Sequence, residues 1–326
     1  MAPFLIAVIS HNVIMQQIRL ITDSTVNITL LGAGAIGALW AVKLTQQQHT
    51  VQLWTRHSET ETTLHFSELT SPTTTDSHHF NCNDPHALAA SELLIVTVKA
   101  FQVVTALTPL LPYLNTDCVV IIMHNGIGTQ SQVQQLLPHN PIIYATTSQA
   151  AFKPTQTTIQ HTGLGQTSLG AINDPAQSQS HIAILFDGAL APAQWQANIY
   201  QPLWQKLAIN CAINPLTALH QCCNGDLAQA CYQSQLDAIC LEVTQVMAAE
   251  GFTTTQQQLR HQVDNVIKAT ANNYSSMNRD IFHHRRTEID YINGYLVQQA
   301  QRHKIDTPIN NQLWQAIKHM ESLNHA

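Results

Sequence analysis

The sequence predicts an α/β protein in which a doubly wound parallel sheet is followed by an all-helical C-terminal domain. A β-rich run beginning at Asn27 leads through a glycine-rich turn into an amphipathic helical stretch. Further apolar runs of strand length follow, with helical sequence between them, as in a parallel sheet buried on both faces. From about Ala193 the pattern changes to long helical periodicity without strand runs, which predicts a second, helical domain.

The bulk composition excludes several classes of protein. With 326 residues and 44% hydrophobic content, the chain is long enough for two domains, each with its own core. Charged residues make up 10% with a net charge of -6, and no basic block is present, so we expect no nucleic-acid partner. No apolar run approaches the ~20 residues that a membrane span requires.

The cysteine pattern indicates reduced thiols in a cytoplasmic protein. The seven cysteines are odd in number, and none lies in a C-x-x-C pair of the kind used by zinc or redox sites. The 18 histidines show no H-E-x-x-H motif and no ligand spacing to a cysteine. We therefore predict no metal site and a cytoplasmic location.

The glycine-rich turn predicts a Rossmann-type dinucleotide-binding domain. It reads LGAGAIG at 31–37, a G-x-G-x-x-G motif with a strand before it, a helix after it and a second strand at the right distance. Gly32 would permit the tight turn, Gly34 the close approach of a pyrophosphate, and Gly37 the packing of helix on strand. Amides at the helix N-terminus would face the anion. The residues expected around the diphosphate are Gly32, Ala33, Gly34, Ala35, Ile36 and Gly37.

The end of the second strand indicates which dinucleotide is bound. NAD-binding domains place Asp or Glu there for the ribose hydroxyls, whereas this chain has Thr55 and Arg56. A cation suits the additional 2′-phosphate, so we predict NADPH as the cofactor. The alternative is that Arg56 is a solvated loop residue.

Polar residues follow the predicted central strands at 93–98, 118–123 and 142–147. Ligands of such sheets bind beyond the carboxyl ends of the strands, so these positions are candidate ligand contacts. They are Lys99 and Gln102 after the first strand, His124, Asn125 and Gly126 after the second, and Ser148 to Ala151 after the third. Weaker alternating runs at 156–161 and 166–171, around a glycine-bearing turn, are expected to extend the edge of the sheet.

A second polar cluster lies in the run LWQKLAINCAINPLTAL, where Lys206, Asn210 and Asn214 recur at four-residue intervals in an apolar helical pattern. At about 100° per residue these positions stack along one helix face. The three polar groups would therefore project together from a helix face that is otherwise apolar and expected to be buried. The alternative is a lysine that reaches water beside asparagines that act as caps.

Two carboxylates occur in a later stretch that we expect to be helical. Glu288 and Asp290 accompany an apolar face marked by Ile289, Ile292 and Leu296. We expect one of the two carboxylates to meet Lys206. A lysine paired with a carboxylate stays protonated at neutral pH, and a protonated lysine is the general acid that a ketone reduction needs.

Together these motifs resemble the 2-dehydropantoate 2-reductases, also called ketopantoate reductases. The resemblance runs from about Asn27 to the C-terminal helix. It is carried by LGAGAIG at 31–37, the arginine after the second strand, VKAFQ at 98–102, HNGIGT at 124–129, KLAINCAINPLTAL at 206–219, NG at 224–225, SSM at 275–277 and TEIDYINGYL at 287–296.

The resemblance implies reduction of ketopantoate to (R)-pantoate with NADPH, in pantothenate and coenzyme A synthesis. It implies that Lys206 is the proton donor, and that Glu288 contacts the nicotinamide ribose or orients Lys206. The implied ligands of ketopantoate are Asn210, Asn214, Asn224 and Ser276. The implied cofactor contacts are Gly32 to Gly37, Arg56, Lys99, Asn125 and Ala150 or an adjacent residue of the QAAF stretch.

The expected organisation is an N-terminal extension at 1–25, an NADP-binding Rossmann domain at 26–194 and a helical substrate and catalytic domain at 195–326.

The sequence is compatible with two alternative functions. One is a reductase of another branched 2-keto acid on the same scaffold, and the other is a non-catalytic NADPH-binding sensor. The three asparagines favour a hydroxylated substrate, because buried amides would go unpaired against a plain alkyl chain. A sensor has no need of both Lys206 and Glu288.

Overall fold

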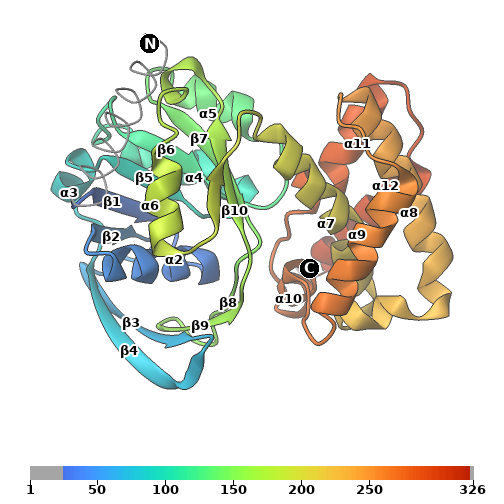
Figure 1. Cartoon of the computed structure of the whole chain (residues 1–326), viewed down its shortest axis with the longest axis horizontal. Coiled ribbons are helices and arrows are strands. Elements are labelled where there is room, and N and C mark those ends of the chain that lie inside the picture. Colours follow the sequence, from blue (N-terminus) through green and yellow to red (C-terminus); the bar gives the residue numbers. More distant parts are fainter. Residues whose placement is uncertain (1–24, 324–326) are drawn as a thin grey trace, which may run out of the picture. The chain divides into compact units, whose positions relative to one another are not determined.

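The computed structural model describes residues 25–323, so the predicted N-terminal extension lies outside the described residues except for Thr25. The chain forms two compact units, whose elements are labelled in Figure 1. Among the described residues, the first comprises 25–98, 102–124 and 131–199, and the second comprises 99–101, 125–130 and 200–323. The units divide after Ile199, whereas the predicted boundary at 194/195 falls within the last strand of the first unit.

The first unit is built on a seven-stranded sheet with the order β11-β10-β7-β6-β5-β1-β2. Its strands are β1 (Asn27–Leu31), β2 (Thr50–Trp54), β5 (Leu93–Val96), β6 (Val119–Ile122), β7 (Ile142–Thr147), β10 (Thr167–Ala171) and β11 (Ala193–Trp195). The five strands from β2 to β7 are parallel, and β10 is antiparallel to β7. This confirms the predicted doubly wound α/β sheet.

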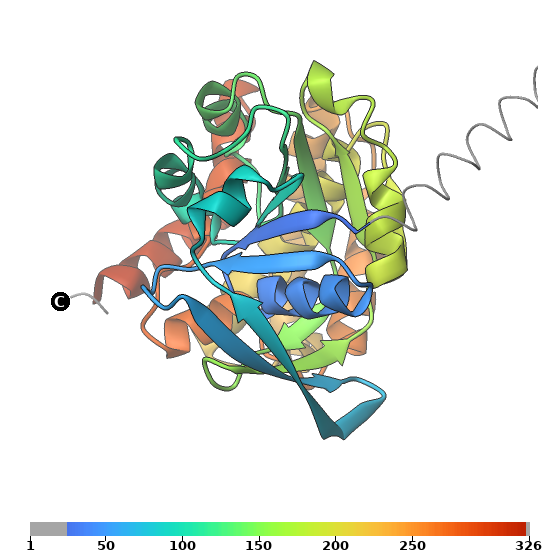
Figure 2. The ribbon, with the colours of Figure 1, turned by 90° about the vertical axis from the view of Figure 1, so that its left-hand side faces the viewer.

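Apolar side chains explain why the central strands are buried on both faces. Every residue of β5, β6 and β7 is buried, as expected for continuous apolar runs in a parallel sheet. In Figure 2 the blue helix α2 (Ala35–Gln46) lies on one face of the sheet, and the teal and green helices of residues 85–136 lie on the other. The ring centroids of Trp40 of α2 and Phe186 of α6 (Ile182–Ala189) lie 4.6 Å apart, with the ring planes tilted by 51°, so these two helices lie side by side.

The shorter helices of this unit connect the strands. They are α3 (Pro85–Ala89), α4 (Val103–Leu107), α5 (Gln130–Leu136) and the 3₁₀ turns η1 (Ala100–Gln102), η2 (Thr108–Leu110) and η3 (Asp174–Ala176). Asp84 caps α3 by accepting a hydrogen bond from the His86 N–H at 2.8 Å, and Pro85 occupies the first turn, where no N–H is needed.

A second sheet, not predicted from the sequence, has the order β4-β3-β9-β8. Its strands are β3 (Glu61–Glu68), β4 (Ser71–Asn81), β8 (Ala150–Phe152) and β9 (Thr158–Gly163). The two runs expected at the edge of the main sheet, 156–161 and 166–171, therefore belong to different sheets. The strand β10 joins the main sheet, and β9 joins the second one. The strand β11 also lies in a region expected to be free of strands, and it pairs in parallel with β10.

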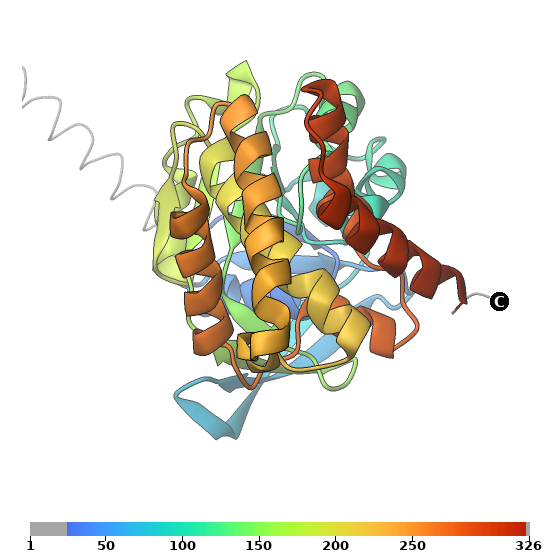
Figure 3. The same cartoon turned by 90° about the vertical axis from the view of Figure 1, so that its right-hand side faces the viewer.

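The second unit consists of helices in its described residues (Figure 3). They are α7 (Tyr200–His220), η4 (Asn224–Ala228), α8 (Ala230–Ala249), α9 (Gln256–Ala269), α10 (Ser276–Phe282), η5 (Ile289–Tyr291), α11 (Asn293–Arg302) and α12 (Pro308–Leu323). The central helix α7 contacts α8, α9, α10 and α12. None of the helices described within residues 25–323 is both long and apolar enough to cross a membrane.

The central helix α7 contains a proline at 215, and a neighbouring side chain compensates for it. Pro215 has no N–H to donate to the carbonyl of Cys211, four residues earlier. The side chain of Asn293 donates to that carbonyl at 3.2 Å and to Oδ1 of Asn310 at 2.9 Å. The helix therefore continues past the proline to His220.

Candidate active site

The turn between β1 and α2 has the backbone geometry that its three glycines predict. Gly32 has a φ of +98°, and a Cβ there would lie 2.7 Å from Cγ1 of Val98. A Cβ on Gly37 would lie 2.1 Å from the carbonyl oxygen of Gly32, so helix and strand could not pack as closely with any other residue. A Cβ on Gly34 would meet no atom within 4 Å, which leaves the backbone open to a ligand.

The N-terminus of α2 is suited to an anion. Gly34 is the N-cap residue, no side chain caps the helix, and its first turn contains no acidic residue. The first-turn amides and the positive end of the helix dipole therefore face outward without a competing carboxylate. The hydroxyl of Thr97 donates to the Gly32 carbonyl at 2.6 Å and so stabilises the turn. These residues fit the diphosphate of a dinucleotide.

Arg56 lies in the loop after β2, where its side chain is exposed. The loop itself is held by Asn83, a residue with a φ of +58°. Its Oδ1 accepts from the Thr55 N–H at 2.8 Å, and its Nδ2 donates to the carbonyls of His57 at 2.6 Å and Glu59 at 3.0 Å. The guanidinium of Arg56 thus stands on a loop whose backbone is fixed by another residue.

Ala150 begins the short strand β8 and is half-buried. The pairing of β8 with β9 shifts register between Ala150 and Ala151. A Cβ on Gly163 of β9 would lie 3.2 Å from the Cβ of Ala150, so the two strands approach closely at this point.

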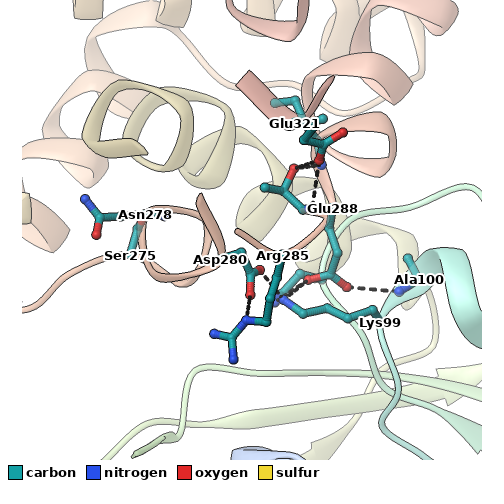
Figure 4. Close-up of polar contacts among 11 residues, drawn as sticks. Lys99, Ala100, Ser275, Asn278, Asp280, Arg285, Glu288 and Glu321 are labelled. Atoms are coloured by element: carbon teal, nitrogen blue, oxygen red, sulfur yellow. Dashed lines mark hydrogen bonds and ion pairs between the residues drawn. The ribbon is translucent and has the colours of Figure 1, made fainter. Parts of the chain in front are cut away.

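In the second unit, Glu288 has three donors around its carboxylate, and two of them, Lys99 and Asn125, were predicted from separate parts of the sequence; its contacts with Ala100 and Lys99 are drawn in Figure 4. Its Oε1 accepts from the Ala100 N–H at 3.0 Å, and its Oε2 accepts from Nδ2 of Asn125 at 3.1 Å and faces Nζ of Lys99 at 3.4 Å. The residue is only 4% exposed. The structure therefore brings together three residues named as cofactor contacts, Lys99, Asn125 and Glu288.

Lys99 also pairs with Asp280, a residue that the sequence did not reveal. Their atoms Nζ and Oδ2 lie 2.6 Å apart, and the other oxygen of Asp280 lies 3.3 Å from Nε of Arg285 (Figure 4). Burial would lower the pKa of Lys99, but Glu288 and Asp280 outweigh it and raise that pKa. Burial raises the pKa of Asp280, against the opposing charge of Lys99. Lys99 is consequently a fixed cation.

Lys206 is a half-buried residue of α7, and the charge of Glu288 acts on its pKa. Desolvation lowers the pKa of Lys206 to about 8, and the Glu288 carboxylate opposes this change. Desolvation is thus the larger of the two effects on this pKa. The group nevertheless remains mainly protonated at pH 7.

The segment carrying Glu288 is not the continuous helix expected from the sequence. The helix α10 ends at Phe282, and Glu288 precedes the 3₁₀ turn η5. The N–H and hydroxyl of Thr287 both donate to Oε1 of Glu321 at 2.7 Å, which anchors this non-helical segment to α12.

Asp290, the other carboxylate considered as a partner of Lys206, belongs to a different cluster. It accepts from Nε1 of Trp314 at 2.9 Å and from Nζ of Lys318 at 3.1 Å. Burial would raise the pKa of Asp290, but these hydrogen bonds outweigh it and lower that pKa.

Three asparagines predicted as substrate ligands lie on α7 and η4. Asn210 is half-buried, and Asn214 and Asn224 are each 7% exposed. Nδ2 of Asn224 donates to the hydroxyl of Thr270 at 2.9 Å, whereas its buried Oδ1 has no hydrogen-bond partner among residues 25–323. A buried acceptor of this kind is costly unless a ligand supplies the donor.

Ser276 is the first residue of α10 and is exposed. The preceding residue, Ser275, is the buried cap of the helix and accepts from the Asn278 N–H at 3.0 Å. The two adjacent hydroxyls are therefore distinct, because that of Ser275 is engaged in structure and that of Ser276 faces outward.

Comparison with known proteins gives consistent matches over both units. Residues 28–174 match the family model described as ketopantoate reductase PanE/ApbA, and residues 198–321 match the model of its C-terminal part. A 2-dehydropantoate 2-reductase of Vibrio cholerae is 45% identical over 295 residues, covering 90% of this chain and 98% of the relative. The enzyme of that name from Yersinia pestis is 40% identical over 295 residues, covering 90% and 95%.

Solved structures agree in fold. A PanE/ApbA family ketopantoate reductase from Ralstonia eutropha superposes with a TM-score of 0.82 at 22% identity, covering 92% of this chain and 99% of that one. A D-mandelate dehydrogenase with NADH and anilino(oxo)acetate superposes with a TM-score of 0.83 at 21% identity, with the same coverage. At these identities the structures support the fold alone. With family models matching most of the chain and relatives at 40% identity or more, the protein belongs to the ketopantoate reductase PanE/ApbA family of NAD(P)-dependent oxidoreductases.

Proposed function

We propose that this protein catalyses the NADPH-dependent reduction of ketopantoate to (R)-pantoate, a step of pantothenate biosynthesis. The observation that carries the proposal is the coupling of Lys206, whose pKa is lowered to about 8, to the buried carboxylate of Glu288. A cation kept protonated but close to its titration point is suited to transfer a proton at neutral pH. The expected cytoplasmic location stays a prediction.

The first unit would bind the cofactor. The turn from Gly32 to Gly37 would receive the diphosphate at the uncapped end of α2, and the exposed Arg56 would pair with the 2′-phosphate. Ala150 would be a further contact of the cofactor. Bound NADPH supplies the hydride that is added to C2 of the keto acid.

The second unit would supply the proton. The ammonium of Lys206 would donate a hydrogen bond to the ketone oxygen and stabilise the negative charge that grows on it. It would then transfer a proton to the alkoxide, so that one hydride and one proton convert ketone to alcohol. The neutral amine left on Lys206 would recover its proton from water.

Glu288 would position and tune the acid. It is held by the N–H of Ala100, by Asn125 and by the fixed cation Lys99, so its carboxylate has a defined orientation. Its negative charge opposes the desolvation of Lys206 and keeps more of that lysine protonated. Glu288 would also contact the nicotinamide ribose, and Lys99 and Asn125 would be further contacts of the cofactor.

The substrate would be held by neutral polar groups. Asn210 and Asn214 stand one and two turns after Lys206 on α7, and Asn224 offers a buried oxygen that lacks a donor. A hydroxyl on the substrate would satisfy that oxygen, which favours ketopantoate over a keto acid with a plain alkyl chain. Ser276 would supply a further hydrogen bond from the start of α10.

The test is the loss of NADPH absorbance when ketopantoate is added to the purified protein, with 2-ketoisovalerate, which lacks the hydroxymethyl group, run in parallel. We expect fast turnover with ketopantoate and slow turnover with the analogue. Comparable rates would indicate a reductase of broader specificity. Absence of turnover with both would favour a protein that binds NADPH without catalysis.

A further inference from the structure

We propose that Lys153 is a further dinucleotide-binding residue, whose ammonium contacts the diphosphate of the cofactor. This inference rests on the proposed NADPH site and adds a residue that neither the glycine motif nor the strand-end pattern identifies. Lys153 follows directly after β8, and its side chain is half-buried.

The position of Lys153 is defined by one contact within the first unit. Its Nζ donates to the carbonyl oxygen of Ala33 at 2.5 Å. Ala33 is the middle residue between Gly32 and Gly34, so the ammonium lies at the turn that leads into α2. Ala33 and Ala151 pack against the same hydrophobic core, which explains why the end of β8 reaches this turn.

The charge of Lys153 has no carboxylate partner among the described residues. Three other lysines are ion-paired, Lys43 with Glu68, Lys99 with Asp280, and Lys318 with Asp290. For Lys153, burial alone shifts the pKa, and it lowers it. A partly desolvated cation without a counter-ion costs free energy in the unliganded protein, which an anion at the turn would recover.

The remaining hydrogen-bonding capacity of the ammonium points to the same ligand. A lysine ammonium has three N–H donors, of which the Ala33 carbonyl occupies one. The adjacent first turn of α2 contains no acidic residue and no side-chain cap. A diphosphate in front of Gly34, where a Cβ would meet nothing within 4 Å, would therefore face helix amides from one element and the ammonium from another.

A purely structural role is the competing explanation, in which Lys153 only holds the Ala33 carbonyl. The variants Lys153→Gln and Lys153→Arg separate the two. Glutamine retains a donor for that carbonyl without the charge, and arginine retains the charge. Dissociation constants are measured by titration calorimetry for NADPH, NADH and adenosine 2′-phosphate, which lacks the diphosphate, together with the melting temperature of each unliganded variant.

We expect Lys153→Gln to weaken NADPH and NADH by the same factor, ~10- to 100-fold, because both contain the diphosphate and lose one charge-assisted hydrogen bond. Binding of adenosine 2′-phosphate should stay at the parental value, and the melting temperature should not fall, because the partly desolvated charge is removed while a donor for the Ala33 carbonyl is kept. Lys153→Arg should restore most of the affinity. Arg56→Gln serves as the reverse control, since it should weaken NADPH and adenosine 2′-phosphate and spare NADH.

Parental affinity of Lys153→Gln for both dinucleotides would overturn the proposal. So would a fall in melting temperature with unchanged binding, since that outcome assigns Lys153 to the fold. If the parent protein itself bound neither dinucleotide, the cofactor part of the proposed function would fail as well, which distinguishes that result from a failure at Lys153 alone.

Discussion

Desolvation lowers the pKa of Lys206 to about 8, and the carboxylate of Glu288 is the charge that keeps it from falling further. The two residues come from separate elements, Lys206 from α7 and Glu288 from the turn before η5. Their balance sets the pH range in which the proposed proton donor is loaded. It also makes the contribution of Glu288 measurable without removing Lys206.

The rate of reduction should fall as the pH rises through about 8, because the proposed acid loses its proton there. Glu288→Gln should move this limb to lower pH, since the charge that raises the pKa of Lys206 is gone while the shape of the side chain is kept. The measurement is kcat/KM for ketopantoate between pH 6 and 10 at saturating NADPH. Identical profiles for parent and variant would show that Glu288 does not tune the acid.

Lys206→Gln should lower kcat by roughly 10²- to 10⁴-fold, the usual contribution of a positioned acid. The dissociation constant for NADPH should change little, because the cofactor contacts are assigned to other residues. Lys268→Gln, on the exposed side of α9, is the matched control and should behave as the parent does. Near-parental turnover of Lys206→Gln would remove this lysine from the mechanism.

Arg56→Gln should weaken NADPH by ~10- to 100-fold and leave NADH nearly unchanged, because only NADPH carries the phosphate that the guanidinium would pair with. The measurement is the dissociation constant of each cofactor. His57→Gln, the exposed neighbour on the same loop, controls for general disturbance of the loop. Equal losses for both cofactors would return Arg56 to the role of a solvated loop residue.

Asn224→Ala should lower kcat/KM for ketopantoate by ~10- to 100-fold, since the buried Oδ1 can no longer accept from the substrate hydroxyl. With 2-ketoisovalerate the change should be small. The melting temperature should hold, because Thr270, the present partner of Asn224, keeps its bond to the Val266 carbonyl at 2.7 Å. Parallel losses for both substrates would argue against recognition of the hydroxyl.

The central strands were predictable because burial on both faces leaves a direct trace in the sequence. The parallel strands β5, β6 and β7 are continuous apolar runs, and the glycine motif marks the first β–α crossing. The common helix of Lys206, Asn210 and Asn214 was predictable for a related reason, since polar residues at helical spacing stand out in an apolar helix; their roles as site residues stay predictions.

Elements that depend on tertiary contacts were missed. The strands β3 and β4 form a long hairpin. The residues of β4 are almost all exposed and rich in threonine and histidine, so the sequence shows no apolar alternation that would predict this strand. The separation of β9 from β10 depends on which sheet each one meets. Asp280 and Lys153 could not be identified from the sequence, because the contacts of a single charged residue depend on partners distant in the chain. Asp280 pairs with Lys99, and Lys153 donates to the carbonyl of Ala33.

The way Asn83 holds the loop after β2 separates the shape of that loop from its chemistry. Three backbone groups, the N–H of Thr55 and the carbonyls of His57 and Glu59, are tied to this one amide. The side chain at position 56 contributes nothing to these bonds, so it is free to vary while the backbone stays in place. Under the proposed assignment of Arg56 to the 2′-phosphate, exchange of its guanidinium for a carboxylate would redesign coenzyme preference, because the scaffold tolerates the change and only the charge at position 56 is altered.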